Sequence, residues 1–243
     1  MWRMSLVLIV AAGACAAAPA PVAAVAAVAA QPAHCPLPAF GPGATYRPVF
    51  FAGHHTARVT NRWFPLRPGT SSIYTGVEDG RRAIDVVVVS QHRRTIDGVR
   101  TRVVVDRLYQ GGRLVERTHD YYAQDRCGNV WYFGEDTAEV DAAGHVTSRE
   151  GTWHAGRDGA RPGVFMPAHP RVGQRFRQEW LAGHAEDVFR IVRRTPTEVR
   201  TRETSALEPG VVDAKVYRRG IGELTEHSVR GGSDRLALDA LVR

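Results

Sequence analysis

The sequence predicts a mostly β protein, a single antiparallel sheet that is curved or closed partway into a half-open barrel. Turn signals rich in Gly, Asn, Asp and Pro recur about every eight to twelve residues, which is typical of antiparallel β domains. Apolar side chains alternate with arginines along many intervening segments, as expected for a sheet with one buried face and one wet face. No apolar stripe of helical period continues beyond about two turns, so little helix is expected after the N-terminal segment.

Residues 1–30 have the composition of a secretory signal peptide. Arg3 is the only charged residue among them, and Val28-Ala29-Ala30 satisfies the small-residue rule of a cleavage site. A different interpretation places processing before Cys15, which would then carry a lipid. Both interpretations predict export, to the periplasm or to the outside of the cell, with membrane attachment only through Cys15.

Residues 31–62 are rich in Pro, Gly, Ala and His without a sustained period, and we expect an irregular arm over the domain surface. The antiparallel β domain is predicted over residues 63–243. It opens with Trp63-Phe64-Pro65-Leu66 as an apolar plug and with Pro68-Gly69 in a type II turn. The length remaining after cleavage is enough for one domain with one core.

The predicted strands follow one another along this domain. The first group comprises Ser72–Val77, Ala83–Gln91, Val99–Leu108, Leu114–Gln124 and Val130–Glu135, with weaker strands at Ala138–Asp141 and Val146–Trp153. A long loop rich in Gly and Pro is predicted over residues 156–173. The second group comprises Arg175–Leu181, Asp187–Arg194, Thr197–Thr204, Ala214–Arg218, Glu223–Val229 and Arg235–Val242.

The segment Asp120–Asp136 predicts a β-hairpin that turns at Cys127-Gly128. A loop of two or four residues places Asp125 opposite Val130. The pairs on one side of the sheet are then Gln124 with Trp131, Tyr122 with Phe133, and Asp120 with Glu135. Opposed carboxylates repel each other, so the acid pair indicates either a site or a rim position, where both acids are solvated or where an arginine of a neighbouring strand, such as Arg102 or Arg113, pairs with them.

A second hairpin, Gln178–Asp187, repeats this pattern of paired acids. With Leu181 opposite Ala185, Glu179 lies opposite Asp187. The candidate ligands of a divalent, calcium-like cation are therefore Asp120, Glu135, Glu179 and Asp187. The alternative is that the two pairs lie on opposite sides of the domain, and no Asp-x-Asp-x-Asp-Gly loop accompanies them.

Two cysteines, Cys35 and Cys127, remain after removal of residues 1–30. An even number of cysteines in an exported protein predicts a disulfide, which would tie the arm to the hairpin turn. The alternative is two unpaired thiols. Neither a Cys-x-x-Cys motif nor a histidine at ligand spacing accompanies them, which argues against a zinc knuckle or a redox centre.

The sequence carries no catalytic or cofactor signature. It lacks Gly-x-Ser-x-Gly, His-x-His and His-Glu-x-x-His motifs, and no glycine loop precedes a predicted helix. The formal net charge is +7, but the arginines are dispersed rather than gathered in a stripe, which disfavours nucleic-acid binding. We expect a monomer without a cofactor, and a binding role in preference to an enzymatic one.

Aromatic side chains supply the other candidate site. The ligand-binding candidates are Tyr122, Trp131, Phe133 and Trp180, because a half-open β structure leaves a concave apolar face. The alternative is that these rings form only the core of the curved sheet. Binding of an apolar or amphipathic molecule, or an interaction with a cell-envelope component, is the function we expect. Its rival is a calcium-stabilised module or a metal-dependent hydrolase that uses the paired carboxylates.

Four segments resemble a group of exported bacterial domains of unknown function. They are Trp63–Thr70, Asp120–Asp136, Gln178–Asp187 and Val216–Leu224, the last with a Tyr-x-x-Gly-x-Gly turn. Those domains resemble the lipoprotein-carrier (LolA/LolB-like) group, whose fold is an incompletely closed antiparallel barrel around a hydrophobic cavity. The resemblance covers about residues 62–242 and implies this half-barrel fold, with no established activity. The carriers plug their barrel with helices, whereas no strong helix is predicted here.

Overall fold

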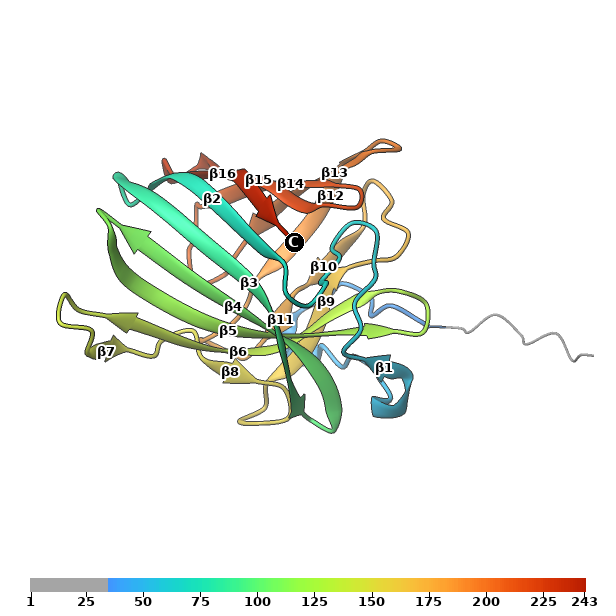
Figure 1. The fold of residues 1–243 in the computed structure, drawn as a ribbon. Helices are drawn as coiled ribbons and strands as arrows, with labels where there is room; N and C mark the ends of the chain where they lie inside the picture. Colours follow the sequence, from blue (N-terminus) through green and yellow to red (C-terminus); the bar gives the residue numbers. More distant parts are fainter. Residues whose placement is uncertain (1–34) are drawn as a thin grey trace, which may run out of the picture. The chain divides into compact units, whose positions relative to one another are not determined.

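The computed structural model describes residues 35–243, and long antiparallel strands dominate this part of the chain (Figure 1). The first five long strands are β2 (Ser71–Glu78), β3 (Arg81–Ile96), β4 (Val99–Gln110), β5 (Arg113–Asp125) and β6 (Val130–Val140). The last five are β12 (Val188–Arg194), β13 (Glu198–Thr204), β14 (Val212–Arg218), β15 (Gly222–Arg230) and β16 (Arg235–Val242). All ten lie where the alternating pattern predicts strands.

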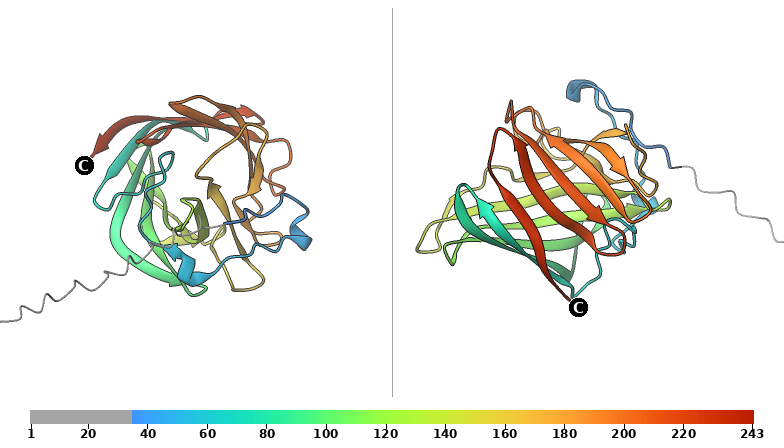
Figure 2. Two further views of the ribbon diagram at one scale, coloured as in Figure 1. Left: turned by 90° about the vertical axis from the view of Figure 1, so that its right-hand side faces the viewer. Right: turned by 90° about the horizontal axis from the view of Figure 1, so that it is seen from above.

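Short elements complete the fold. They are the 3-10 turns η1 (Gly43–Thr45) and η2 (Ala52–His54) and the strands β1 (His55–Thr56), β7 (Val146–Ser148), β8 (Trp153–His154), β9 (Arg161–Met166), β10 (Arg175–Arg177) and β11 (Glu179–Trp180). The strands join in one sheet of sixteen, ordered β10-β12-β13-β14-β15-β16-β2-β3-β4-β5-β6-β9-β11, with β1, β7 and β8 paired beside this path. The predicted single antiparallel sheet is confirmed, and it curls into a nearly closed barrel (Figure 2).

One extended segment, residues 175–180, bridges the two edges of the sheet. Its first part, β10, pairs with β12, and its second part, β11, pairs with β9. Between them, the Gln178 amide donates a hydrogen bond to the Asp187 carbonyl at 2.8 Å. The barrel therefore closes at a seam where a single strand changes partners.

Strand β9 corrects the prediction of a continuous loop over residues 156–173. Pro162 and Gly163 weaken the local strand signal, yet the strand is buried from Pro162 to Met166. A Cβ atom on Gly163 would lie 2.3 Å from main-chain atoms of Arg177 and Gln178. Glycine is required here because the seam brings two backbones together, a contact that local sequence patterns do not reveal.

The N-terminal segment from Cys35 to Arg62 packs against the outside of β5 and β6. Strand β1 pairs with the end of β5, and the Phe50 ring contacts the Phe133 ring at 5.5 Å between centroids. The predicted Cys35–Cys127 disulfide is present, with the two Cα atoms 6.0 Å apart. Both faces of β6 between Val130 and Gly134 are consequently buried.

No helix within residues 35–243 is long and apolar enough to cross a membrane. The predicted signal peptide (residues 1–30) and the predicted anchor at Cys15 lie outside the described residues.

Candidate functional site

The barrel encloses a cavity of about 320 Å³, which we call the lumen. Figure 2 (left) shows the barrel around the lumen, viewed along the barrel axis. Its wall follows the two-residue period of the strands, so that Asp85, Val87 and Val89 of β3 all face inward. The apolar part of the wall comprises Phe64, Leu66, Val87, Val89, Val104, Tyr122, Phe165, Ile221, Leu236 and Leu241.

All four of the acids singled out in the sequence line the lumen. Asp120 and Glu135 are direct cross-strand partners, as predicted. Glu179 and Asp187 flank the seam, and the predicted bridge between Leu181 and Ala185 is present beside them. The two hairpins thus converge on one cavity, although the metal role assigned to these acids stays a prediction.

The register of the first hairpin differs from the predicted one. The loop spans three residues, because the Asp125 amide donates to the Asn129 carbonyl, and Tyr122 pairs with Tyr132. A β-bulge at Gly134, whose φ is 140°, then adds one residue to β6. Beyond this bulge the pairing returns to the predicted register. The predicted Tyr122–Phe133 and Gln124–Trp131 pairs are therefore wrong, while the Asp120–Glu135 pair survives because the two offsets cancel.

Only one of the four aromatic candidates, Tyr122, lines the lumen. Trp131 and Phe133 are 2% and 0% exposed, and both contact the His55 ring of the N-terminal segment on the outer face of β6. Trp180 also lies outside the lumen, with its ring beside Gly43 and the Arg177 guanidinium 4.7 Å from its centroid. The expectation that Trp131 and Phe133 share the face of Tyr122 is wrong, because the arm provides a second apolar environment on the outer face of β6.

Four further acids line the lumen and were not identified from the sequence. They are Asp85, Asp106, Glu223 and Glu226. A single basic side chain, Lys215, accompanies all eight carboxyl groups in the lining. One signal was available in the sequence, because Lys215 is the only lysine in a chain that otherwise uses arginine.

Lys215 lies within a group of three glutamates. Its Nζ atom is 3.1 Å from Glu226 Oε1, 3.5 Å from Glu203 Oε2 and 4.0 Å from Glu223 Oε2. Burial acts to lower the pKa of Lys215, but these carboxylates raise that pKa well above its usual value. Lys215 is therefore a cation whose charge is already matched by its neighbours.

The remaining lumen acids hold their protons to unusually high pH. Removal from bulk water, reinforced by the charge of Asp106, raises the pKa of Asp120 to about 7. Burial and the neighbouring Asp120 raise the pKa of Glu135 to about 8. Hydrogen bonds from Tyr132 Oη to Asp120 Oδ1 at 2.6 Å and from Thr137 Oγ1 to Glu135 Oε2 at 3.0 Å oppose these shifts only in part. Several carboxyl groups in the lumen therefore titrate near neutral pH.

A tight metal site is not preformed among these carboxylates. Within the described chain, the one group of three potential ligand atoms closer than 4.8 Å is Cys35, Asp125 and Cys127. Its sulfur atoms form the disulfide, and Asp125 accepts hydrogen bonds from the Asn129 amide and side chain and from the Trp131 indole.

A separate polar cluster lies on the outer face of β6 and centres on Asp136. Its carboxylate binds the Arg94 guanidinium, accepts a hydrogen bond from Tyr121 Oη at 2.5 Å and lies 2.9 Å from His154 Nε2. Burial acts against ionisation, but the Tyr121 hydrogen bond and the Arg94 charge lower the pKa of Asp136. The Arg94, Tyr121 and Asp136 side chains bind one another, so we interpret the cluster as a structural network on the barrel wall.

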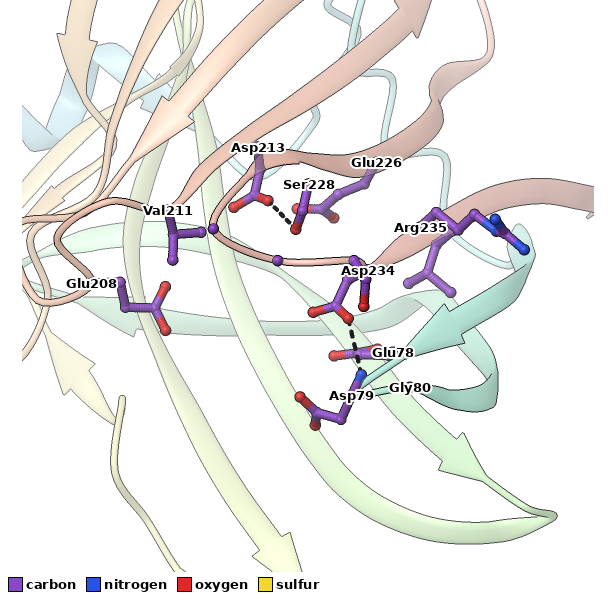
Figure 3. A pocket seen from close by; sticks show the side chains of 14 residues that line it. Glu78, Asp79, Gly80, Glu208, Val211, Asp213, Glu226, Ser228, Asp234 and Arg235 are labelled. Atoms are coloured by element: carbon purple, nitrogen blue, oxygen red, sulfur yellow. Dashed lines mark hydrogen bonds between the residues drawn. The ribbon is translucent and has the colours of Figure 1, made fainter.

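A second cavity of about 430 Å³ lies at one end of the barrel, which we call the mouth (Figure 3). The turns β2–β3 and β15–β16 and the loop between β13 and β14 form it. Glu226 and Leu236 line both the mouth and the lumen, so the two cavities adjoin.

No protein-family model matches the chain, and no curated protein matches it. Among solved structures, the chain is similar to a candidate exported protein of Bacteroides fragilis described as having a YmcC-like fold. The two share 14% sequence identity over 75% of this chain and 100% of that chain, with a TM-score of 0.41.

Proposed function

We propose that this is an exported binding protein whose lumen holds a small amphipathic molecule without transforming it chemically. The observation that supports this most directly is the two-sided wall of the lumen. Phe64, Tyr122 and Phe165 pack around one part of the cavity, while carboxyl groups line the other. Small-molecule sites are concave and combine apolar side chains with placed polar groups, and the lumen has both, with carboxyl groups as most of its polar lining.

The signal-peptide composition of residues 1–30 and the barrel form support the same proposal. An antiparallel barrel around a cavity is the architecture that the resemblance to lipoprotein carriers implies, and carriage of an apolar or amphipathic molecule, or an interaction with a cell-envelope component, fits that architecture. The cavity of about 320 Å³ is at the small end of ligand sites, so the bound portion of the molecule is small.

Binding to the lumen can be tested with the uncharged fluorescent probe N-phenyl-1-naphthylamine. We expect a saturable rise in fluorescence with the native protein. Val87→Trp places an indole into the lumen and should abolish most of this rise. The matched control is Ile84→Trp on the same strand, where the native side chain is 46% exposed and does not line the lumen.

Retention of full probe binding in Val87→Trp would show that the probe binds elsewhere. Absence of saturable binding by the native protein would contradict the proposed function directly. Circular dichroism and a urea titration of both variants establish that each remains folded, so that loss of binding reports occupation of the lumen.

A further inference from the structure

The acidic residues of the lumen and of the mouth indicate the chemical class of the ligand. The inference drawn from them rests on the proposed function. We propose that the amphipathic ligand carries a protonated amine, which passes through the mouth and binds among the lumen carboxyl groups beside the aromatic rings. Four features of the described residues support this in turn: the distribution of charge, an unpartnered oxygen, the aromatic lining and the composition of the mouth.

The lumen lining is rich in acidic residues, although the whole protein is rich in basic ones. The chain has a formal net charge of +7, yet the lumen lining contains eight carboxyl groups and one cation. That cation, Lys215, forms its ion pairs with Glu203, Glu223 and Glu226. Within residues 35–243, no ion pair neutralises Asp85, Asp106, Asp120 or Glu135, so these four carboxyl groups have no cationic partner in the protein when they ionise.

One carboxylate oxygen on this side of the lumen has no partner. Asp85 lines the cavity and shares a hydrogen bond with the Asp106 carboxyl group, but its Oδ1 atom is buried without a hydrogen-bond partner among the described residues. A buried acceptor without a donor costs free energy, and native structures rarely contain one. A ligand ammonium group supplies several N–H donors and a compensating charge at once.

The rings next to these carboxyl groups suit a cation as well. Tyr122 and Tyr132 stack with centroids 4.8 Å apart, and Phe165 meets the Tyr122 ring edge-on at 4.9 Å. Tyr132 also donates its hydroxyl hydrogen bond to Asp120, which joins the aromatic and acidic parts of the wall. Aromatic faces attract ammonium groups, most strongly where water is excluded, so rings and carboxylates together recognise an amine with an apolar substituent.

The mouth continues the acidic lining toward solvent. Its carboxyl groups come from three loops and three strands: Asp79, Glu208 and Asp234 from the loops, and Glu78, Asp213 and Glu226 from β2, β14 and β15. The single basic residue in its lining is Arg235, and Figure 3 shows the Arg235 guanidinium directed away from these acids. A recess lined by one sign of charge attracts small ions of the opposite sign, so the mouth favours the approach of cations on a protein whose net charge repels them.

Three ligands with the same eight-carbon chain test the inference on the native protein at about pH 8. We expect calorimetric titration to show that octylamine binds about tenfold or more tightly than octan-1-ol, because a charge-assisted hydrogen bond adds to the same apolar contact. Octanoate should bind most weakly. The amine preference should shrink several-fold in Asp85→Asn and in Asp120→Asn, and should persist in Glu139→Gln, an exposed acid on β6 outside the lumen.

Equal affinity for the three ligands overturns the amine inference, and leaves the proposed function intact if N-phenyl-1-naphthylamine still binds in the lumen. Tighter binding of octanoate than of octylamine overturns it as well. A saturable calcium signal that disappears in Asp120→Asn, together with no heat from octylamine, assigns the carboxyl groups to a metal instead. Because the first comparison uses only the native protein, its result does not depend on how the variants fold.

Discussion

Individual carboxyl groups in the lumen carry most of the chemical information in this protein. Glu179 is only 7% exposed, and burial together with the charge of Asp187 raises its pKa well above the usual value. Glu223, at the opposite wall, has its pKa raised to about 8 by burial despite the nearby Lys215. Such shifts are common at ligand sites, because the geometry that suits a ligand leaves charges poorly solvated in its absence.

These raised pKa values predict that the protein becomes less stable as the pH rises. The ordinary pKa of glutamate is 4.5, whereas the pKa of folded Glu135 is about 8. Between these values the folded state binds more protons than the unfolded state, so the stabilisation is complete below about pH 4.5 and is lost as the pH rises through 8. We expect the free energy of unfolding to fall by an amount on the order of a few kcal/mol between pH 5 and pH 9.

Urea titrations across this pH range measure the effect. Glu135→Gln should flatten the decline, because an amide cannot titrate, whereas Glu139→Gln on the same strand should leave its slope unchanged. A native protein that is as stable at pH 9 as at pH 5 would contradict the assignment of raised pKa values to the lumen.

At the scale of elements, two irregular strands determine how the barrel closes. The bulge next to Gly134 restores the pairing of Asp120 with Glu135, and it also lets β8 approach, since a Cβ atom at Gly134 would lie 2.4 Å from the Trp153 carbonyl oxygen. Strand β9 lies between β6 and β11 and connects the long strands to the seam. Both features depend on a glycine at a close contact between two backbones.

Gly163→Ala should destabilise the seam. The added Cβ atom would lie 2.3 Å from main-chain atoms that cannot rotate away, so β9 and residues 175–180 must separate. We expect a loss of about 1–3 kcal/mol in the free energy of unfolding, typical of overpacking, and faster amide exchange confined to these two segments. Gly53→Ala is the control, because a Cβ atom there has nothing within 4 Å. Unchanged exchange in Gly163→Ala would mean that the seam does not hold these backbones in contact.

At the largest scale, residues 35–243 form a barrel that the segment Cys35–Arg62 holds from outside. This segment covers Trp131 and Phe133 and is joined covalently to the β5–β6 turn by the Cys35–Cys127 disulfide. The disulfide connects positions separated by 92 residues, so it closes a long loop of the unfolded chain. Long loops have the most conformational entropy to lose when they are closed.

Reduction of this disulfide should lower the free energy of unfolding by about 4–5 kcal/mol, on the chain-entropy estimate for a loop of this length. Urea unfolding with and without a reductant measures the difference. A double variant with Cys35→Ser and Cys127→Ser should resemble the reduced protein and should not respond to the reductant. If reduction leaves the stability of the native protein unchanged, the N-terminal segment contributes through packing alone.

Local sequence patterns were sufficient to predict the antiparallel β class, most strand positions, the disulfide and the adjacency of Asp120 to Glu135. These features follow from local rules, because alternation, turn residues and cysteine number act over short stretches of chain. Even the hairpin error concerned only an offset, and it left the acid pair correctly placed.

The side of each strand that faces the lumen, by contrast, depends on long-range contacts that local patterns do not contain. A two-residue period shows which residues share a face but not what covers that face, and in β6 both faces are apolar because the N-terminal segment covers the outer one. For the same reason the sequence did not predict β9. This strand contains Pro and Gly, and its pairing with residues 175–180 stabilises it. The presence of eight acids and Lys215 in one lumen depends on strands distant in the chain, and only closure of the barrel brings them together.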